Sequence, residues 1–158
     1  MCIRDSTLIS RPLVTKFIEL SKHISDQEAE NLISRIGDIT DETGPITWRL
    51  IINNSNAPAL VQHLNNHSNL SIDQLSQHNL FPRATSIPLL LQHKNKHHLI
   101  PNSEMSVNIG DQILFCGPRN NTFLAQYLRD NQELVDSLIN RNEAHIPLRR
   151  WLLRRKAQ

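Results

Sequence analysis

Histidine is the residue type in this chain that most strongly suggests a chemical function. The chain has eight histidines, and His93, His97 and His98 lie around one polar turn in "LQHKNKHHLI". Neutral imidazole is a common metal ligand, and residues that face each other across a hairpin can share an ion. However, His97 and His98 would point to opposite faces of a strand, and Lys94 and Lys96 disfavour a bound cation. We therefore expect a solvated polar turn and no metal site.

The other groups that could carry chemistry give no catalytic constellation. His63 and His67 are four residues apart on an expected helix but have no third ligand, so we expect surface residues. Cys116 lies in the apolar run "ILFCG", where a thiol is expected to be a buried small hydrophobe and not a stabilised thiolate. No G-x-S-x-G elbow occurs, and Asp41 and Glu42 lie in turn-like sequence. We expect no catalytic residues and no enzymatic activity.

Glycine is too scarce for a nucleotide-binding loop. The four glycines, Gly37, Gly44, Gly110 and Gly117, are far apart, and no G-x-G-x-x-G can be built from them. The chain itself is therefore expected to bind no dinucleotide and to carry no cofactor.

The basic residues are concentrated at the C-terminal end. Six of the 17 Lys and Arg residues but one of the 15 acids follow residue 140, which leaves 11 bases against 14 acids before it. The body of the chain thus lacks a basic face, and no nucleic-acid partner is expected. In the tail "PLRRWLLRRKAQ", Leu148, Trp151 and Leu152 could meet an anionic membrane surface with the arginines. The interpretation that we favour is that Trp151 and Leu152 pack on the domain or on a partner subunit.

Composition favours one small globular core. Hydrophobic residues make up 39% and aromatic residues 4% of the chain, so aliphatic packing must build the interior. No apolar run approaches the roughly 18 residues that can span a bilayer, and the start has no signal-peptide pattern.

The periodicity predicts an α+β order of elements. A helix from Pro12 should bury Leu13, Phe17, Leu20 and Ile24, with the proline in its first turn. "SDQE", residues 25–28, is a capping box that should open a second helix ending at Gly37. A strand over 46–52 and a helix over 57–66, capped by Asn56, should follow.

The second half of the chain is expected to be richer in strands. We predict a short strand around 70–75, then a hairpin formed by 87–91 and 99–100, with Pro88 suggesting an edge strand or an unpaired amide. The stretch "VNIGDQILFCGP" should form a turn at Gly110-Asp111, a buried strand over 112–116 and a stop at Gly117-Pro118. One or two helices should follow within 119–140.

Taken together, "IPLLLQHKNKHHLIPNSEMSVNIGDQILFCG" resembles the C-terminal subdomain of RCK (regulator of K⁺ conductance) domains, also called the TrkA-C domain. The matching features are a strand with a polar turn, Ile100-Pro101, a variable loop, Ile109-Gly110-Asp111 and a buried strand that ends in glycine. The resemblance covers residues 45–118. It is most similar to a branch that occurs in bacterial membrane proteins of the potassium-channel type.

The resemblance implies a division of the chain. Residues 1–6, "MCIRDS", look non-native; 7–40 look like the helical connection out of a Rossmann-like subdomain; 45–118 are the TrkA-C-like domain; and 119–158 hold C-terminal helices and the basic tail. The chain would then be a C-terminal fragment. NAD or another nucleotide would belong to the upstream subdomain, which would follow a transmembrane pore.

The resemblance also implies a function. We expect a regulatory, ligand-sensing and dimerising subdomain of a potassium channel or K⁺ transport protein, on the cytoplasmic side of the cell membrane. Its partners would be a second copy, the pore and a small-molecule or ion effector, with unknown ligand residues. The alternative is a small-molecule-binding regulatory module of another transporter or of a transcription factor.

Overall fold

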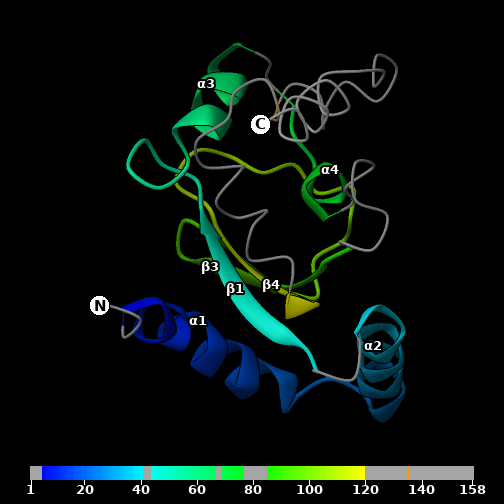
Figure 1. Cartoon of the computed structure of the whole chain (residues 1–158). Helices are drawn as coiled ribbons and strands as arrows, with labels where there is room; N and C mark the ends of the chain where they lie inside the picture. The colour runs from blue at the N-terminus through cyan, green and yellow to red at the C-terminus, as the bar shows by residue number, and fades with distance from the viewer. Residues whose placement is uncertain (1–4, 41–43, 67–68, 77–84, 120–134, 136–158) are drawn as a thin grey trace, which may run out of the picture.

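The structure is a computed structural model that describes residues 5–40, 44–66, 69–76, 85–119 and 135. These residues form an α+β fold with one four-stranded antiparallel sheet and helices packed against it, as the sequence predicts (Figure 1). The elements are α1 (Asp5–Ser21), α2 (Asp26–Ile39), β1 (Ile46–Ile51), α3 (Pro58–Asn66), α4 (Ile72–Ser76), β2 (Ile87–His93), β3 (Lys96–Leu99) and β4 (Gln112–Gly117).

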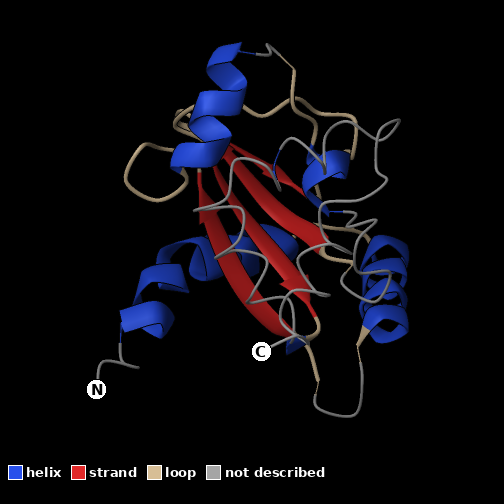
Figure 2. Ribbon diagram, turned by 45° about the horizontal axis from the view of Figure 1, so that its top comes forward, coloured by secondary structure: helices blue, strands red, loops and turns tan. Residues whose placement is uncertain are grey.

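The last of the described strands, β4, lies in the middle of the sheet. The strand order is β1-β4-β2-β3, and β4 pairs antiparallel with both β1 and β2 (Figure 2). Ile113, Leu114 and Phe115 are fully buried because both faces of this strand are covered. The predicted buried strand after Gly110-Asp111 is thus confirmed.

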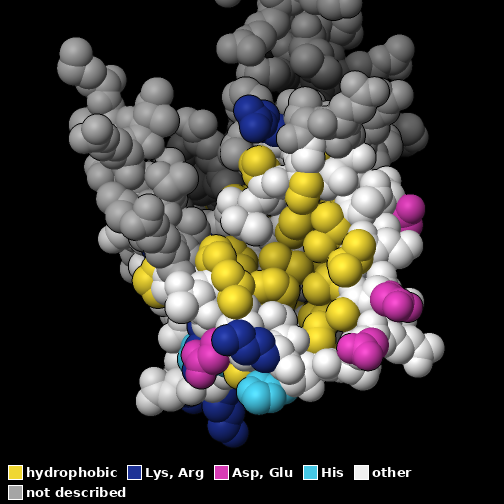
Figure 3. Space-filling model, turned by 90° about the horizontal axis from the view of Figure 1, so that it is seen from below, with side chains coloured by type: hydrophobic (Ala, Val, Ile, Leu, Met, Phe, Trp, Pro, Cys, Tyr) yellow, Lys and Arg dark blue, Asp and Glu magenta, His cyan; other side chains and the backbone are white. Residues whose placement is uncertain are grey.

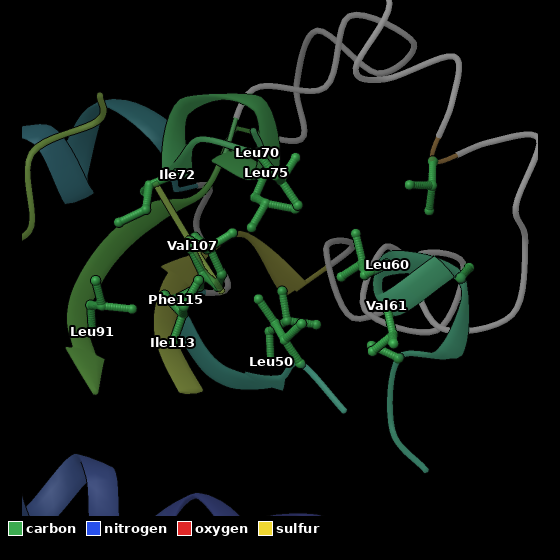
Figure 4. Packing of buried hydrophobic residues seen from close by; sticks show 14 of the residues in the cluster. Leu50, Leu60, Val61, Leu70, Ile72, Leu75, Leu91, Val107, Ile113 and Phe115 are labelled. Carbon is green, nitrogen blue, oxygen red and sulfur yellow. The ribbon is translucent and has the colours of Figure 1, made fainter. Parts of the chain in front are cut away.

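One face of the sheet packs against α3, α4 and the loops beside them. This first cluster holds Trp48 and Leu50 from β1, Leu91 from β2, and Ile113 and Phe115 from β4. Figure 4 shows Leu50, Leu91, Ile113 and Phe115 of these strands with α3 and α4, from which Leu60, Val61, Ile72 and Leu75 join the cluster. The rings of Trp48 and Phe115, which are register partners, stack with centroids 4.5 Å apart.

The opposite face is covered by α1 and α2, which lie below the sheet in Figure 1. In this second cluster Leu13 of α1 and Leu32 of α2 pack with Leu90, Leu114 and Cys116. The 7–40 segment therefore supplies a layer of the same fold as the sheet.

The two N-terminal helices differ in detail from the prediction. The capping box is confirmed: Ser25 N–H donates to Glu28 Oε2 (3.1 Å) and Glu28 N–H donates to Ser25 Oγ (3.3 Å). The first of these hydrogen bonds lowers the pKa of the Glu28 carboxyl. The predicted start of the first helix and the predicted end of the second were wrong. Pro12 lies inside α1, where it leaves one intrahelical hydrogen bond unmade, and α2 continues past Gly37 to Ile39.

Two further local predictions were wrong. Residues 72–76 form α4 and not a strand, because Ser71 and Gln74 form a second capping box: Gln74 N–H donates to Ser71 Oγ and Ser71 N–H to Gln74 Oε1. Only Ser71 forms an isolated bridge, with Ser106. Asn56 does not cap α3, which begins at Pro58; its side-chain amide donates to Asn53 Oδ1 instead (2.9 Å).

The hairpin is confirmed, with a two-residue turn at Lys94-Asn95 between β2 and β3. Of the two alternatives for Pro88, the edge strand was wrong, because β2 lies between β4 and β3, while the unpaired position fits the structure. The β2–β3 register begins only at Leu90, and the β2–β4 register shifts between Pro88 and Leu90. A proline is tolerated at such an irregularity because it cannot donate to the ladder.

The helices predicted within 119–140 and the basic tail lie outside the described residues, apart from Arg119 and Val135. Val135 is fully buried in the first cluster. No helix in the described ranges is long and apolar enough to cross a bilayer.

Candidate functional site

A pocket of about 530 Å³ lies where α2 meets the sheet domain. Its walls come from four parts of the chain: the end of α2, helix α4, the segment 85–88 that enters β2 and the segment 100–103 that leaves β3. Ligand pockets typically enclose about 300–1,000 Å³, so this one has the size for a small molecule. It is our candidate functional site.

Backbone hydrogen bonds fix the pocket's inner wall. Ser86 N–H donates to Ser76 O (3.0 Å), which ties the start of β2 to the end of α4. Asp73 N–H donates to Ser103 O (2.8 Å), which ties the first turn of α4 to the segment after β3. Because both bonds join segments far apart in the sequence, the wall is built before any ligand arrives.

Local conformation explains why residues 100–103 face the pocket. Ile100 has a φ of 45°, in the left-handed region, so the chain turns sharply off β3 there. Its N–H donates to Leu89 O (2.9 Å), and Pro101 follows as a buried wall residue. The turn thus brings Asn102 and Ser103 to the pocket, where they face α4.

The pocket carries charges of both signs. Arg35 and Asp38, three residues apart on α2, supply a guanidinium and a carboxylate, and Asp73 of α4 supplies a second carboxylate. Ser76, Thr85 and Ser86 add hydroxyl groups that can donate or accept. Such a site can orient a small polar molecule by charge and by hydrogen bonds.

A histidine–carboxylate pair forms a second feature, at the turn before β4. His93 Nδ1 lies 2.7 Å from Asp111 Oδ1, and the side chain of Asp111 is 1% exposed while that of His93 is 32% exposed. Asp111 Oδ2 accepts a hydrogen bond from Asn108 N–H (2.8 Å). The carboxylate is therefore held on both oxygens and fixes the orientation of the imidazole.

Gly110 makes this turn possible. Its φ is 96°, which only glycine adopts without strain, and its N–H donates to Ile52 O (2.7 Å). The predicted turn at Gly110-Asp111 is confirmed, and within it the Asp111 side chain accepts a hydrogen bond from the backbone of Asn108.

The histidines considered as metal ligands do not converge. His97 and His98 lie opposite Gln92 and Leu91 in the hairpin, while the His93 ring turns to Asp111. Within the described ranges, no three His, Cys, Asp or Glu residues are placed to hold one ion. The prediction that His63 is a surface residue was wrong, because it is 2% exposed in α3; His67 lies outside the described residues.

Cys116 is a buried thiol, as predicted. It lies in the second cluster, and burial raises the pKa of the thiol because the thiolate would lose its hydration. This environment suppresses nucleophilic chemistry.

Some apolar side chains of α1 and α2 remain accessible. Ile18 is 54% exposed and Ile33 is 69% exposed, and the partly buried Val14, Phe17 and Ile36 lie against the second cluster. We call these five residues the helical apolar surface. Figure 3, which views the molecule from below, shows hydrophobic side chains gathered on this side.

A comparison with models of known protein families finds no match to this chain, and a search of curated proteins finds no similar sequence.

Proposed function

We propose that this chain is a regulatory domain that senses a small ligand and pairs with a second copy, in the manner of the RCK C-terminal domains that it resembles. In this proposal it belongs to a potassium channel or K⁺ transport protein and acts on the cytoplasmic side of the membrane. The small α+β fold with its buried strand after Gly110-Asp111 is compatible with that family.

The observation that carries the proposal is the position of the pocket. One wall belongs to α2 and the others to α4 and to the segments that flank the β2–β3 hairpin. A ligand that contacts α2 and the sheet domain at the same time stabilises the arrangement of these two parts in which both contacts can form. A ligand can shift such an equilibrium only by its difference in affinity for the two arrangements.

The helical apolar surface supports pairing. Exposed large apolar side chains such as Ile18 and Ile33 are stabilised when a partner covers them, and a stable interface needs roughly 800 Å² from each partner. Since α2 contributes to both the pocket and this surface, ligand binding and association would be coupled through one helix.

The coupling can be measured on the chain itself. Analytical ultracentrifugation over a range of concentrations should show a monomer–dimer equilibrium. A panel of nucleotides, monovalent and divalent cations and amino acids should contain a compound that raises the thermal midpoint and changes the dimer dissociation constant. By linkage, the factor by which the compound changes the dimer association constant is set by the ratio of its affinities for the dimer and the monomer.

Ile33→Glu should weaken the dimer strongly, because a charge would be desolvated in the interface. Ser34→Glu is the matched control, since it adds the same charge at the neighbouring exposed position of α2. A chain that stays monomeric with every compound, or an Ile33→Glu dimer as tight as the Ser34→Glu dimer, would contradict the proposal.

A further inference from the structure

The pocket holds a cation and two anions in one small space, and this combination restricts what it can bind. Asp73 already has an interaction within the protein, which leaves Arg35 and Asp38 for a ligand. A carboxylate ligand would meet Arg35 but would be repelled by Asp38, and a simple amine would meet Asp38 but would be repelled by Arg35. A molecule that carries a carboxylate and an ammonium group close together can bind the guanidinium and the carboxylate of the pocket at the same time.

The two charged groups on α2 are available for a ligand. Arg35 and Asp38 are exposed, and neither takes part in an ion pair or hydrogen bond within the described part of the chain. Guanidinium binds carboxylate through two parallel N–H donors, which fixes the orientation of the bound group. Asp38 can then accept from an ammonium group one or two bonds away.

The remaining wall suits an uncharged side chain. Ile39, Ile87, Pro88, Ile100 and Pro101 present carbon atoms, and the pocket is large enough for several more heavy atoms beyond the charged head. Asp73 already has an interaction within the protein, so a third ligand charge would be buried against these carbon-lined walls without a free partner, which is costly.

We infer that the pocket takes a free α-amino acid with an uncharged, aliphatic side chain, whose carboxylate meets Arg35 and whose ammonium group meets Asp38. This inference rests on the proposed function, because it names the class of ligand that the sensing domain would bind. The amino acid would bridge α2 and the segments around the hairpin.

Three matched probes test the inference. L-Leucine has both charges, 4-methylpentanoate lacks the ammonium group, and 3-methylbutylamine lacks the carboxylate. With the ¹⁵N-labelled chain, leucine should shift the amide resonances of Asn102 and Ser103 saturably. Each analogue should bind at least about tenfold more weakly, because each loses a hydrogen bond to a charged group.

Variants of Arg35 and Asp38 test which charged group of the ligand each residue binds. Arg35→Gln should weaken leucine about tenfold or more but should not weaken 3-methylbutylamine, which Arg35 repels. Asp38→Asn should weaken leucine but should not weaken 4-methylpentanoate, which Asp38 repels. Glu30→Gln, at an exposed position of α2 outside the pocket, should change nothing. Absence of saturable leucine binding, equal binding of either analogue, or equal loss in the Glu30→Gln control overturns the inference.

The ligand class and the regulatory function can fail independently in these experiments. If leucine fails but another compound of the panel couples to dimerisation, the ligand class is wrong and the regulatory function stands. If leucine binds as described but the chain stays monomeric with it, the pocket chemistry stands and the proposed coupling is wrong.

Discussion

The two faces of the sheet are closed in different ways. The first cluster is covered by α3 and α4, which follow β1 directly, and it contains the Trp48–Phe115 stack. The second is covered by α1 and α2, which precede β1, and it leaves Ile18 and Ile33 exposed at its outer side. The first face therefore has the character of a sealed structural core, while the second combines a sealed inner layer with a surface suited to a partner.

The largest expected effect concerns Cys116, which reports whether the inner layer of the second face is closed. In a Cys2→Ser background, a thiol reagent at pH 8 should modify Cys116 at least about a thousandfold more slowly in native buffer than in denaturant, because access needs opening of a central strand. The raised pKa acts in the same direction, since less thiolate is present at that pH than for an exposed thiol. Rapid native modification would mean that α1 and α2 do not seal this face.

Phe115 and Leu114 are neighbours in β4 but belong to different clusters, so substitutions at these positions compare the stability that each face contributes. Phe115→Ala removes a ring from the first cluster and should cost about 3–5 kcal/mol of unfolding free energy, and Leu114→Ala in the second should cost about 2–5 kcal/mol. Urea denaturation measures both. A Leu114→Ala cost below 1 kcal/mol would show that the helices on the second face add little to the core.

The pair at the turn before β4 should give an intermediate effect. Asp111→Ala leaves the Asn108 N–H and the His93 ring without their acceptor, so we expect a loss of about 2–3 kcal/mol. His93→Ala should cost about 1 kcal/mol, because this side chain is partly exposed and water can solvate the carboxylate that remains. If His93→Ala costs more than Asp111→Ala, the turn is not organised by the carboxylate.

Two glycines give the smallest effects, with opposite signs. Gly110→Val should destabilise by about 1–3 kcal/mol through backbone strain alone, because φ is positive and no atom lies within 4 Å of a new Cβ. Gly37→Ala should stabilise by about 0.5–1 kcal/mol, because α2 continues through this position and the added methyl group meets nothing. Thermal melts of both variants test the pair, and a stabilising Gly110→Val would contradict the turn geometry.

Local hydrogen bonding explains what could be predicted from the sequence. The capping box at Ser25, the turn at Gly110 and the apolar run of β4 each depend on a few adjacent residues, and each was found. The helix α4 was not predicted, although Ser71 and Gln74 have the same capping spacing, because residues 70–75 also alternate weakly between apolar and polar side chains, which is typical of a short strand.

Long-range placement explains what could not be predicted. The His93–Asp111 pair joins residues 18 apart, and it exists because β2 lies beside β4 with Gln92 opposite Gln112. That register also depends on the irregularity between Pro88 and Leu90, which no local pattern indicates. The pocket likewise needs α2, α4 and the hairpin together, so no single motif could reveal it.

The strand order has a consequence for how the chain is made. Among the strands that the structure describes, β1 pairs only with β4, and residues 52–111 separate the two, so β1 lacks this partner until the end of β4 has left the ribosome. Until then the nascent chain carries the apolar side of β1 and a β2–β3 hairpin in which the β2 edge still lacks its partner strand. Such unpaired edges are aggregation-prone, so we expect synthesis that stops before residue 112 to yield chaperone-bound or insoluble product. Insertion of the last strand between two earlier ones would be the step that commits the whole domain to its folded state.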